Sequence, residues 1–345
     1  AGLQKSVESP RQEFFRRLNL APGGTAEIVG MRKALLGRLK DHPELKAVDD
    51  DLAHLFGSWF NRGFLVMRRI DWNTPASVLE KIIAYEAVHE IQGWDDLKRR
   101  LDPADRRCYG FFHPSLVDEP LIFVEVALTR DIPGSIHALI DQDEQEEAEA
   151  PRTAVFYSIS NCQRGLAGIS FGNFLIKQVA NDLSREIESL KTFVTLSPIP
   201  GFMRWLTKTR AEERLSDREL ALLDHANWHK KKDAAARLSP VLQSLAAQYF
   251  LEEKRADGKP VDPVARFHLG NGARLERINW LGDLSERGLG QSAGMMVNYL
   301  YDLSDIERNH EAFAEQGIIA SSSAVQKLLP PKAKMQQKEP EDEVA

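Results

Sequence analysis

The hydrophobic positions in the N-terminal part of the chain have helical spacing. In residues 25–42, apolar side chains recur every three or four positions, at Ile28, Met31, Leu35, Leu36 and Leu39. This spacing places them on one stripe of an amphipathic helix. Residues 50–70 continue the pattern, and Asn73–Thr74–Pro75 supplies the capping residue and early proline of a new helix. We therefore predict an all-helical domain over residues 1–74, with a domain boundary at its end.

From about residue 105 the pattern changes to short apolar runs. Residues 121–128, 154–160 and 192–196 are rich in β-branched and aromatic side chains and are bounded by turn residues, which predicts three strands. Residues 173–190 return to helical spacing, and a charged helical block is predicted for residues 203–254. The predicted fold class is α/β of the α+β type, with a mixed-sheet domain over residues 75–329. Residues 330–345, rich in proline, lysine and glutamate, are predicted to be a disordered tail.

Composition excludes several classes of partner. Hydrophobic residues make up 43% of the chain and charged residues 28%, values typical of a soluble globular protein. The formal net charge of −6 offers nucleic acid no positive field, and no run of ~18 apolar residues could span a membrane. Cys108 and Cys162 have neither paired nor metal-ligand spacing, which favours a reducing compartment. We expect a cytoplasmic protein with no nucleic-acid or membrane partner.

Residues 168–172 read Gly-Ile-Ser-Phe-Gly, the G-x-S-x-G pattern of serine hydrolases, in which Ser170 would be the nucleophile. In those enzymes the strand runs directly into the first glycine, whereas here residues 161–167 intervene. A phosphate-binding loop is the favoured alternative, because Gly165, Gly168 and Gly172 lie between a strand and the start of a helix. Arg164 stands at the mouth of this loop, which resembles the coenzyme A pyrophosphate loop of the GNAT acyltransferase superfamily.

Two other segments carry candidate chemistry. In residues 195–202, TLSPIPGF, the prolines hold Ser197 on a stiff path; they either fix its hydroxyl toward a pocket or simply end a strand. His268 stands between a possible short strand and an Asn-Gly turn, as a residue close to a ligand or as a structural histidine. His225 and His229 are four positions apart on a predicted helix. The glutamate of the H-E-x-x-H motif is missing between them, so no metal site is expected.

Six segments together resemble the malonyl-CoA decarboxylase family. They are RRCYGFFHPSLVDEPLIFVEVAL, FYSIS, FGNFLIKQV, LSPIPGF, FHLGNGARLERINW and MMVNYLY, in this order over residues 106–301. The resemblance extends over nearly all of residues 75–305. It implies a helical oligomerisation domain (1–74), a GNAT-like catalytic domain (75–329) and a homo-oligomer formed through the N-terminal helices. It also implies conversion of malonyl-CoA to acetyl-CoA and CO2 without a metal or an organic cofactor.

The resemblance also implies site residues. Ser197 and His268 match the family's catalytic pair, and Arg164, Asn298 and Tyr301 are expected to line the site. The coenzyme A-binding segment is expected to comprise Ala167, Gly168, Ile169, Ser170, Phe171, Gly172 and Asn173. Animal members of the family carry a glutamate where this chain has Ser170, so no acidic role is transferred to that position.

The chemistry suggests a role for each of these groups. We expect His268, with a pKa near its ordinary value, to protonate the carbanion left by CO2. Ser197 would hydrogen-bond the malonyl carboxylate or relay a proton to His268. Arg164 or Lys177 would pair with the pyrophosphate.

Three other functions compete with the decarboxylase. They are a GNAT-type acyltransferase that uses acetyl-CoA and an amine, a serine hydrolase built on Ser170 with His225 or His268 as base, and a regulator that binds coenzyme A without turnover. The decarboxylase is preferred, because long motifs in register are more specific than the short G-x-S-x-G pattern.

Overall fold

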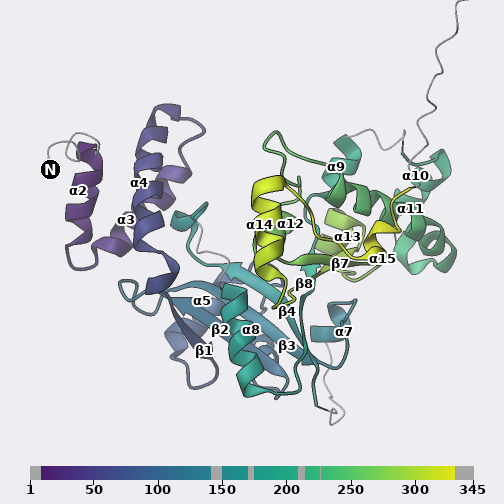
Figure 1. Ribbon diagram of the computed structural model, residues 1–345, viewed down its shortest axis with the longest axis horizontal. Coiled ribbons are helices and arrows are strands. Elements are labelled where there is room, and N and C mark those ends of the chain that lie inside the picture. The colour runs from purple at the N-terminus through teal and green to yellow at the C-terminus, as the bar shows by residue number, and fades with distance from the viewer. Residues whose placement is uncertain (1–8, 141–149, 170–174, 209–213, 226, 331–345) are drawn as a thin grey trace, which may run out of the picture.

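The structure, a computed structural model, describes residues 9–140, 150–169, 175–208, 214–225 and 227–330 (Figure 1). The predicted disordered tail lies outside these residues, apart from Pro330. Helices near the N-terminus lie at one end of the molecule, a sheet runs through the middle, and the helices of the C-terminal part lie at the other end (Figure 1).

The N-terminal part is helical, as the spacing predicts. It comprises α2 (Pro10–Asn19), α3 (Gly24–Leu36), the 3-10 turn η1 (Pro43–Leu45) and α4 (Lys46–Trp59). α2 begins at Ser9 because the serine side chain accepts the N–H of Gln12 and Pro10 fixes the first helical residue. Apolar side chains of these helices are buried in the main core, at Phe15, Ile28, Val29, Leu52, Leu55 and Phe56. Of the stripe predicted for residues 25–42, Ile28 is buried, whereas Met31 is exposed.

The helical prediction is wrong for the end of this region. After the 3-10 turn η2 (Arg62–Phe64), residues Val66–Ile70 form strand β1, which pairs antiparallel with β2 (Arg106–Phe112). The helix ends before this point because Asn61 turns the chain and accepts the N–H of Gly63. A short apolar run does not distinguish helix from strand, so the partner strand decides the structure. The chain thus enters the sheet before residue 74, and the boundary placed there stays a prediction.

Within the described residues the sheet has eight strands and is mixed. The others are β3 (Pro120–Thr129), β4 (Thr153–Asn161), β5 (Thr192–Thr195), β6 (Ser197–Pro198), β7 (Arg274–Asn279) and β8 (Met296–Leu300). Their order is β1-β2-β3-β4-β5-β8-β6, with β7 also paired to β8. Only the pair β4–β5 is parallel among the pairs of the described residues. The three strands predicted from the sequence are confirmed.

Helices cover both faces of the sheet. Alternate residues of β2 and β3 point to opposite faces. Phe111 and Val124 pack with α8 (Leu175–Glu186), the helix predicted for residues 173–190. Phe112 and Phe123 pack with α5 (Ala76–Tyr85) and α6 (Trp94–Leu101) on the other face. The predicted fold class, a helical region followed by a mixed α/β sheet, is confirmed.

The C-terminal half supplies the remaining helices. They are α7 (His137–Ile140), η3 (Arg164–Leu166), α9 (Phe202–Lys208), α10 (Asp217–Leu223), η5 (Trp228–Lys230), α11 (Lys232–Leu251), α12 (Pro263–Gly270), α13 (Glu286–Ser292), α14 (Ile306–Gln316) and α15 (Ser323–Gln326). None of the helices in the described ranges is both long and apolar enough to cross a membrane.

Two local predictions in this half are corrected. His225 and His229 do not share a helix, because α10 ends at Leu223 and Trp228–Lys230 is a separate 3-10 turn. His268 does not follow a strand but lies in the last turn of α12. That helix forms because the Asp262 carboxylate accepts the N–H of Ala265 and Pro263 occupies its first position.

Candidate active site

The parallel pair β4–β5 separates at its carboxyl end. The register runs from Thr153–Thr192 to Phe156–Thr195, after which the N–H of Leu196 donates to the carbonyl of Phe156 at 3.0 Å. The chain after β5 turns to pair with β8 through β6, while β4 runs on beside β3. Within the described residues, the edge of β4 over residues 157–161 therefore has no strand partner on the β5 side.

A cavity of about 240 Å³ opens where the two strands separate. β4 lines it with Phe156, Tyr157 and Ile159, and the segment after β5 contributes Ser197. α12 adds Phe267 and His268, and Val88 lines it from the loop after α5. The cavity is thus mainly apolar, with two candidate reactive groups in its wall.

Ser197 and His268 are brought together in this wall. They are 71 residues apart in the sequence, and Ser197 Oγ lies 3.2 Å from His268 Nε2. Ser197 is held in place because its backbone belongs to β6 and Pro198 follows it, while His268 is held by α12. Both side chains are buried, with exposed fractions of 5% and 4%.

The pair belongs to a longer chain of neutral hydrogen-bonding groups. His268 Nδ1 lies 2.8 Å from the Tyr301 hydroxyl, and Ser197 Oγ donates to Thr195 Oγ1 at 2.9 Å. One direction of donation satisfies the chain: Tyr301 donates to Nδ1, Nε2–H donates to Ser197, and Ser197 donates to Thr195. The ring of Tyr299 stacks on the imidazole with 4.6 Å between ring centroids and 25° between planes. The imidazole is therefore fixed at both nitrogens and on one face.

Burial sets the charge of this site. It lowers the pKa of His268 to about 3, so the imidazole is neutral at pH 7. Burial also raises the pKa of Tyr301 well above its ordinary value, which keeps the phenol protonated. The expectation that His268 has an ordinary pKa is wrong, because the sequence does not show that the ring is enclosed between Tyr299, Tyr301 and Ser197.

Comparison with known proteins identifies the family. The malonyl-CoA decarboxylase N-terminal domain matches residues 1–60, and the malonyl-CoA decarboxylase C-terminal domain matches residues 63–339. The crystal structure of malonyl-CoA decarboxylase from Rhodopseudomonas palustris has 60% sequence identity and a TM-score of 0.89, over 94% of this chain and 81% of that chain. For the enzyme from Agrobacterium vitis the identity is 57% and the TM-score 0.89, over 95% and 82% of the two chains.

A curated relative with a similar sequence is also a malonyl-CoA decarboxylase. The mitochondrial malonyl-CoA decarboxylase of the goose Anser anser anser is 39% identical over 92% of this chain and 69% of that protein. The chain belongs to the malonyl-CoA decarboxylase family. The family predicted from the six sequence segments is thus confirmed. Ser197 of LSPIPGF and His268 of FHLGNGARLERINW are in contact in the structure.

Of the other predicted site residues, Tyr301 contacts His268, whereas Asn298 and Arg164 do not line this cavity. Asn298 Nδ2 donates to the carbonyl of Thr195 at 2.8 Å, and Asn298 Oδ1 accepts from Asn279 at 2.8 Å. Asn298 therefore holds β8 against the strand that positions Ser197. Lys177, expected near the pyrophosphate, donates to Glu307 of α14 at 2.8 Å.

The predicted coenzyme A segment is described only in part. Arg164 lies in η3 with an exposed side chain; Ala167 and Gly168 are also exposed, and Ile169 is half-buried. Ser170, Phe171, Gly172 and Asn173 lie outside the described residues, so their binding role stays a prediction. In the part of the chain that the structure describes, no group of three or more His, Cys, Asp or Glu residues could hold a metal ion.

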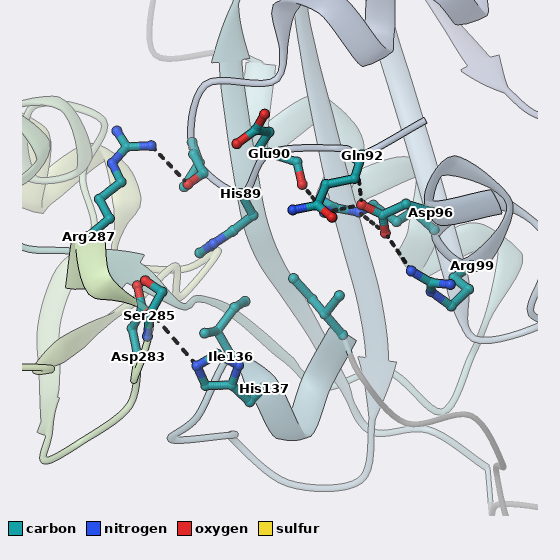
Figure 2. A pocket seen from close by; sticks show the side chains of 13 residues that line it. His89, Glu90, Gln92, Asp96, Arg99, Ile136, His137, Asp283, Ser285 and Arg287 are labelled. Carbon is teal, nitrogen blue, oxygen red and sulfur yellow. Dashed lines mark hydrogen bonds and ion pairs between the residues drawn. The ribbon is translucent and has the colours of Figure 1, made fainter. Parts of the chain in front are cut away.

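A second hollow, of about 470 Å³, is also lined by Val88. Figure 2 shows this second hollow. Several of its polar groups are bound to one another or to the backbone, but His89 Nε2 is buried without a hydrogen-bond partner among the described residues. Asp96 accepts the N–H of Gln92 and pairs with Arg99 (Figure 2). Arg287 donates to the carbonyl of Ala87. This hollow is thus lined by ion pairs and, within the described ranges, by one unpartnered imidazole nitrogen.

A buried charge cluster lies next to this hollow. Arg100 of α6, 4% exposed, donates to Glu125 of β3 at 3.1 Å and to the carbonyl of Glu90 at 3.0 Å. Burial raises the pKa of Glu125, and nearby Glu86 adds to the rise. Glu86 itself accepts hydrogen bonds from Ser158 and from the N–H groups of Val88 and His89. The cluster thereby fixes the loop whose Val88 lines the cavity beside Ser197 and His268.

Thr195 and Tyr299 contact the pair directly and are not predicted from the sequence. Each stands two positions before a predicted residue in an extended segment, Thr195 before Ser197 and Tyr299 before Tyr301. Side chains two positions apart in a strand share a face. That periodicity was the signal that could have found them.

Proposed function

We propose that this protein converts malonyl-CoA to acetyl-CoA and CO2, with Ser197 and His268 at the reacting centre. The observation that carries the proposal is the Ser197–His268 contact in the wall of the cavity between β4 and β5, in a chain of this family. Enzymes of this kind are carboxy-lyases: the bond between C2 and the carboxylate breaks, and a proton replaces it.

The substrate supplies its own electron sink. When CO2 leaves, the electron pair of the broken bond passes into the neighbouring thioester carbonyl and forms an enolate. Malonyl-CoA therefore needs neither a metal nor an organic cofactor for this step, whereas a substrate without such a carbonyl would need one. The protein has to hold the carboxylate out of the thioester plane, where the breaking bond overlaps the carbonyl π system.

The edge of β4 is suited to bind the pantetheine arm of coenzyme A. Over residues 157–161 the backbone groups that face β5 have no strand partner among the described residues. An extended chain that carries amides can hydrogen-bond such an edge as an added strand does. The pantetheine arm has this character, and it would lead the thioester into the cavity beside Ser197. The predicted loop before α8 would then hold the pyrophosphate.

The low pKa of His268 suggests how the proton is delivered. The free site is neutral, and the malonyl carboxylate brings a negative charge beside the imidazole, which raises its pKa in the complex. His268 then takes up one proton, and Ser197 hydrogen-bonds the carboxylate and orients it. As CO2 departs, the imidazolium stabilises the developing enolate and gives its proton to C2. The balance is one proton consumed for each CO2 released.

A single assay separates this function from its rivals. Malonyl-CoA labelled in the free carboxyl is incubated with the protein and no amine, and CO2, acetyl-CoA and free coenzyme A thiol are measured. We expect equal amounts of CO2 and acetyl-CoA and no free thiol, and we expect Ser197→Ala to abolish most of the CO2. Free thiol without CO2 would indicate the hydrolase, and Ser170→Ala would then be the decisive variant. An acyltransferase without its amine, or a regulator, would release neither CO2 nor free thiol.

We also propose that the N-terminal helices mediate self-association. Phe14, Leu20 and Met31 are 54%, 84% and 47% exposed on or beside α2 and α3. Several exposed apolar side chains on one small region favour a protein–protein contact. Light scattering should give a mass larger than one chain, and Leu20→Asp should lower it. A wild-type mass of one chain would contradict this proposal.

A further inference from the structure

We propose that Arg32 of α3 is a positioning residue for substrate binding: it holds the loop after β4 in the conformation that receives the phosphate-bearing part of coenzyme A. This inference rests on the proposed function, because it takes that loop as the coenzyme A site. It gives the N-terminal helices a second role besides self-association.

Arg32 makes three hydrogen bonds, two to the loop after β4 and one to α4. Its Nη1 donates to the carbonyls of Gly165 and Ala167, both at 2.9 Å. Its Nε donates to Asp49 of α4 at 2.8 Å. Arg32 is 4% exposed and Asp49 5%, so these bonds form away from water, where a charged donor contributes most.

The loop is packed tightly against the same helix. A Cβ atom at Gly165 would lie 2.1 Å from the carbonyl oxygen of Val29, so only glycine allows this approach of η3 to α3. On its other side the loop is tied to the sheet, because Gln163 donates to Glu119 and to the carbonyl of Pro120. The conformation of residues 163–167, which lead into the predicted binding segment, is thus set by contacts with α3 and with the sheet.

The contact with Arg32 also decides which way the loop presents its donors. In a trans peptide the carbonyl and the following N–H point in opposite directions. The carbonyl of Ala167 is directed at Arg32, so the N–H of Gly168 is directed away from α3. Ala167 and Gly168 are exposed on that side. Arg32 therefore turns a backbone donor of the predicted phosphate loop toward solvent, where an anion can reach it.

Arginine is needed for this arrangement. Its planar guanidinium carries several N–H groups in a fixed fork, whereas a lysine ammonium is a single point of charge. Lysine at position 32 could pair with Asp49 but could not also hold both carbonyls from the same place. Asp49 is in turn held by Lys46 at 3.0 Å, which keeps the carboxylate aligned for Arg32.

The experiment measures substrate binding separately from chemistry. Arg32→Lys and Asp49→Asn are compared with Arg11→Lys, a control in which Arg11 pairs with Asp51 at 2.8 Å in the same helical region without touching the loop. KM and kcat are measured with malonyl-CoA. Dissociation constants are measured for acetyl-CoA and for S-acetylpantetheine, which lacks the pyrophosphate. Melting temperatures show which variants are folded.

For Arg32→Lys we expect KM and the acetyl-CoA dissociation constant to rise roughly tenfold, as for the loss of a charge-assisted hydrogen bond, with kcat within about twofold. Binding of S-acetylpantetheine should not change. Asp49→Asn should cause a smaller rise of the same kind and provides the test if Arg32→Lys does not fold. Arg11→Lys should match wild type.

Unchanged KM in both variants, or equal weakening of acetyl-CoA and S-acetylpantetheine, would overturn the inference. A purely structural role would lower the melting temperature and kcat together without the difference between the two ligands. If wild type releases no CO2 from malonyl-CoA, the proposed function fails. The acetyl-CoA and S-acetylpantetheine comparison still decides the role of Arg32.

Discussion

Two buried polar clusters lie on opposite faces of the sheet, and they differ in charge. On the face covered by α5 and α6, Arg100 and Glu125 form an ion pair whose members are 4% and 0% exposed. On the other face, Ser197, His268 and Tyr301 form a neutral chain beside a cavity. A buried ion pair favours one arrangement of the chain, because separating the charges is costly. A neutral chain beside a cavity can change its protonation when a charged ligand enters.

Because of this difference, we expect substitutions in one cluster to lower turnover and substitutions in the other to lower stability. Loss of the neutral chain should remove turnover from a protein that still folds. Loss of the ion pair should destabilise a protein whose folded fraction still turns over substrate.

The largest expected effect is that of His268→Ala on turnover. Removal of a general acid lowers kcat by roughly 10²- to 10⁴-fold, and we expect a loss in this range for CO2 release from malonyl-CoA. The melting temperature should fall less than in Arg100→Ala. Turnover within a few-fold of wild type would break the assignment of this cluster to catalysis.

Arg100→Ala should have the largest effect on stability. It leaves Glu125 buried without its cation, which costs about 3–5 kcal/mol in comparable pairs. Urea titration should show this loss, with kcat per folded molecule unchanged. The matched control is Arg17→Ala, which removes an exposed pair with Glu13 at 2.9 Å, where a loss of about 0.5 kcal/mol is expected. Equal losses in the two variants would mean that burial does not distinguish these pairs.

The neutral state of His268 should appear in the pH dependence of stability. Its pKa is about 3 in the folded protein and ~6.5 in an unfolded chain. Between these values the unfolded state binds more protons, so this group's contribution to stability is present above the unfolded pKa and is lost as pH falls toward the folded pKa. Wild type should lose about 2 kcal/mol more than His268→Gln between pH 7 and pH 5. Parallel curves for the two proteins would show that the ring is not desolvated.

The smallest expected effect separates two neighbouring tyrosines. Tyr301→Phe removes the hydroxyl that binds His268 Nδ1, and we expect kcat to fall roughly tenfold, the equivalent of one hydrogen bond. Tyr299→Phe is the control, because the Tyr299 hydroxyl is buried with no hydrogen-bond partner among the described residues. This variant keeps the ring stacked on the imidazole and should retain wild-type kcat. Equal effects would mean that the Tyr301 hydrogen bond does not orient His268.

Much of the fold follows from local sequence patterns. The helices of residues 24–36 and 175–186 and the strands β3, β4 and β5 form where the spacing predicts them, because burial of one face imposes a period of 3.6 or 2 on the sequence. Strand β1 does not follow from such a pattern, since Val66–Ile70 is extended only because β2 lies beside it. The same applies to α12, whose start depends on Asp262 and Pro263 rather than on an apolar stripe.

In the candidate site, too, some features follow from the sequence and others only from the tertiary structure. The sequence by itself determined the identities of Ser197, His268 and Tyr301, because they stand in motifs that can be read along the chain. Only the tertiary structure decided that the first two lie 3.2 Å apart, that the imidazole is neutral, and that Arg32 reaches the loop after β4. Contacts and desolvation depend on which segments pack together across tens of residues, and no local period in the sequence records them.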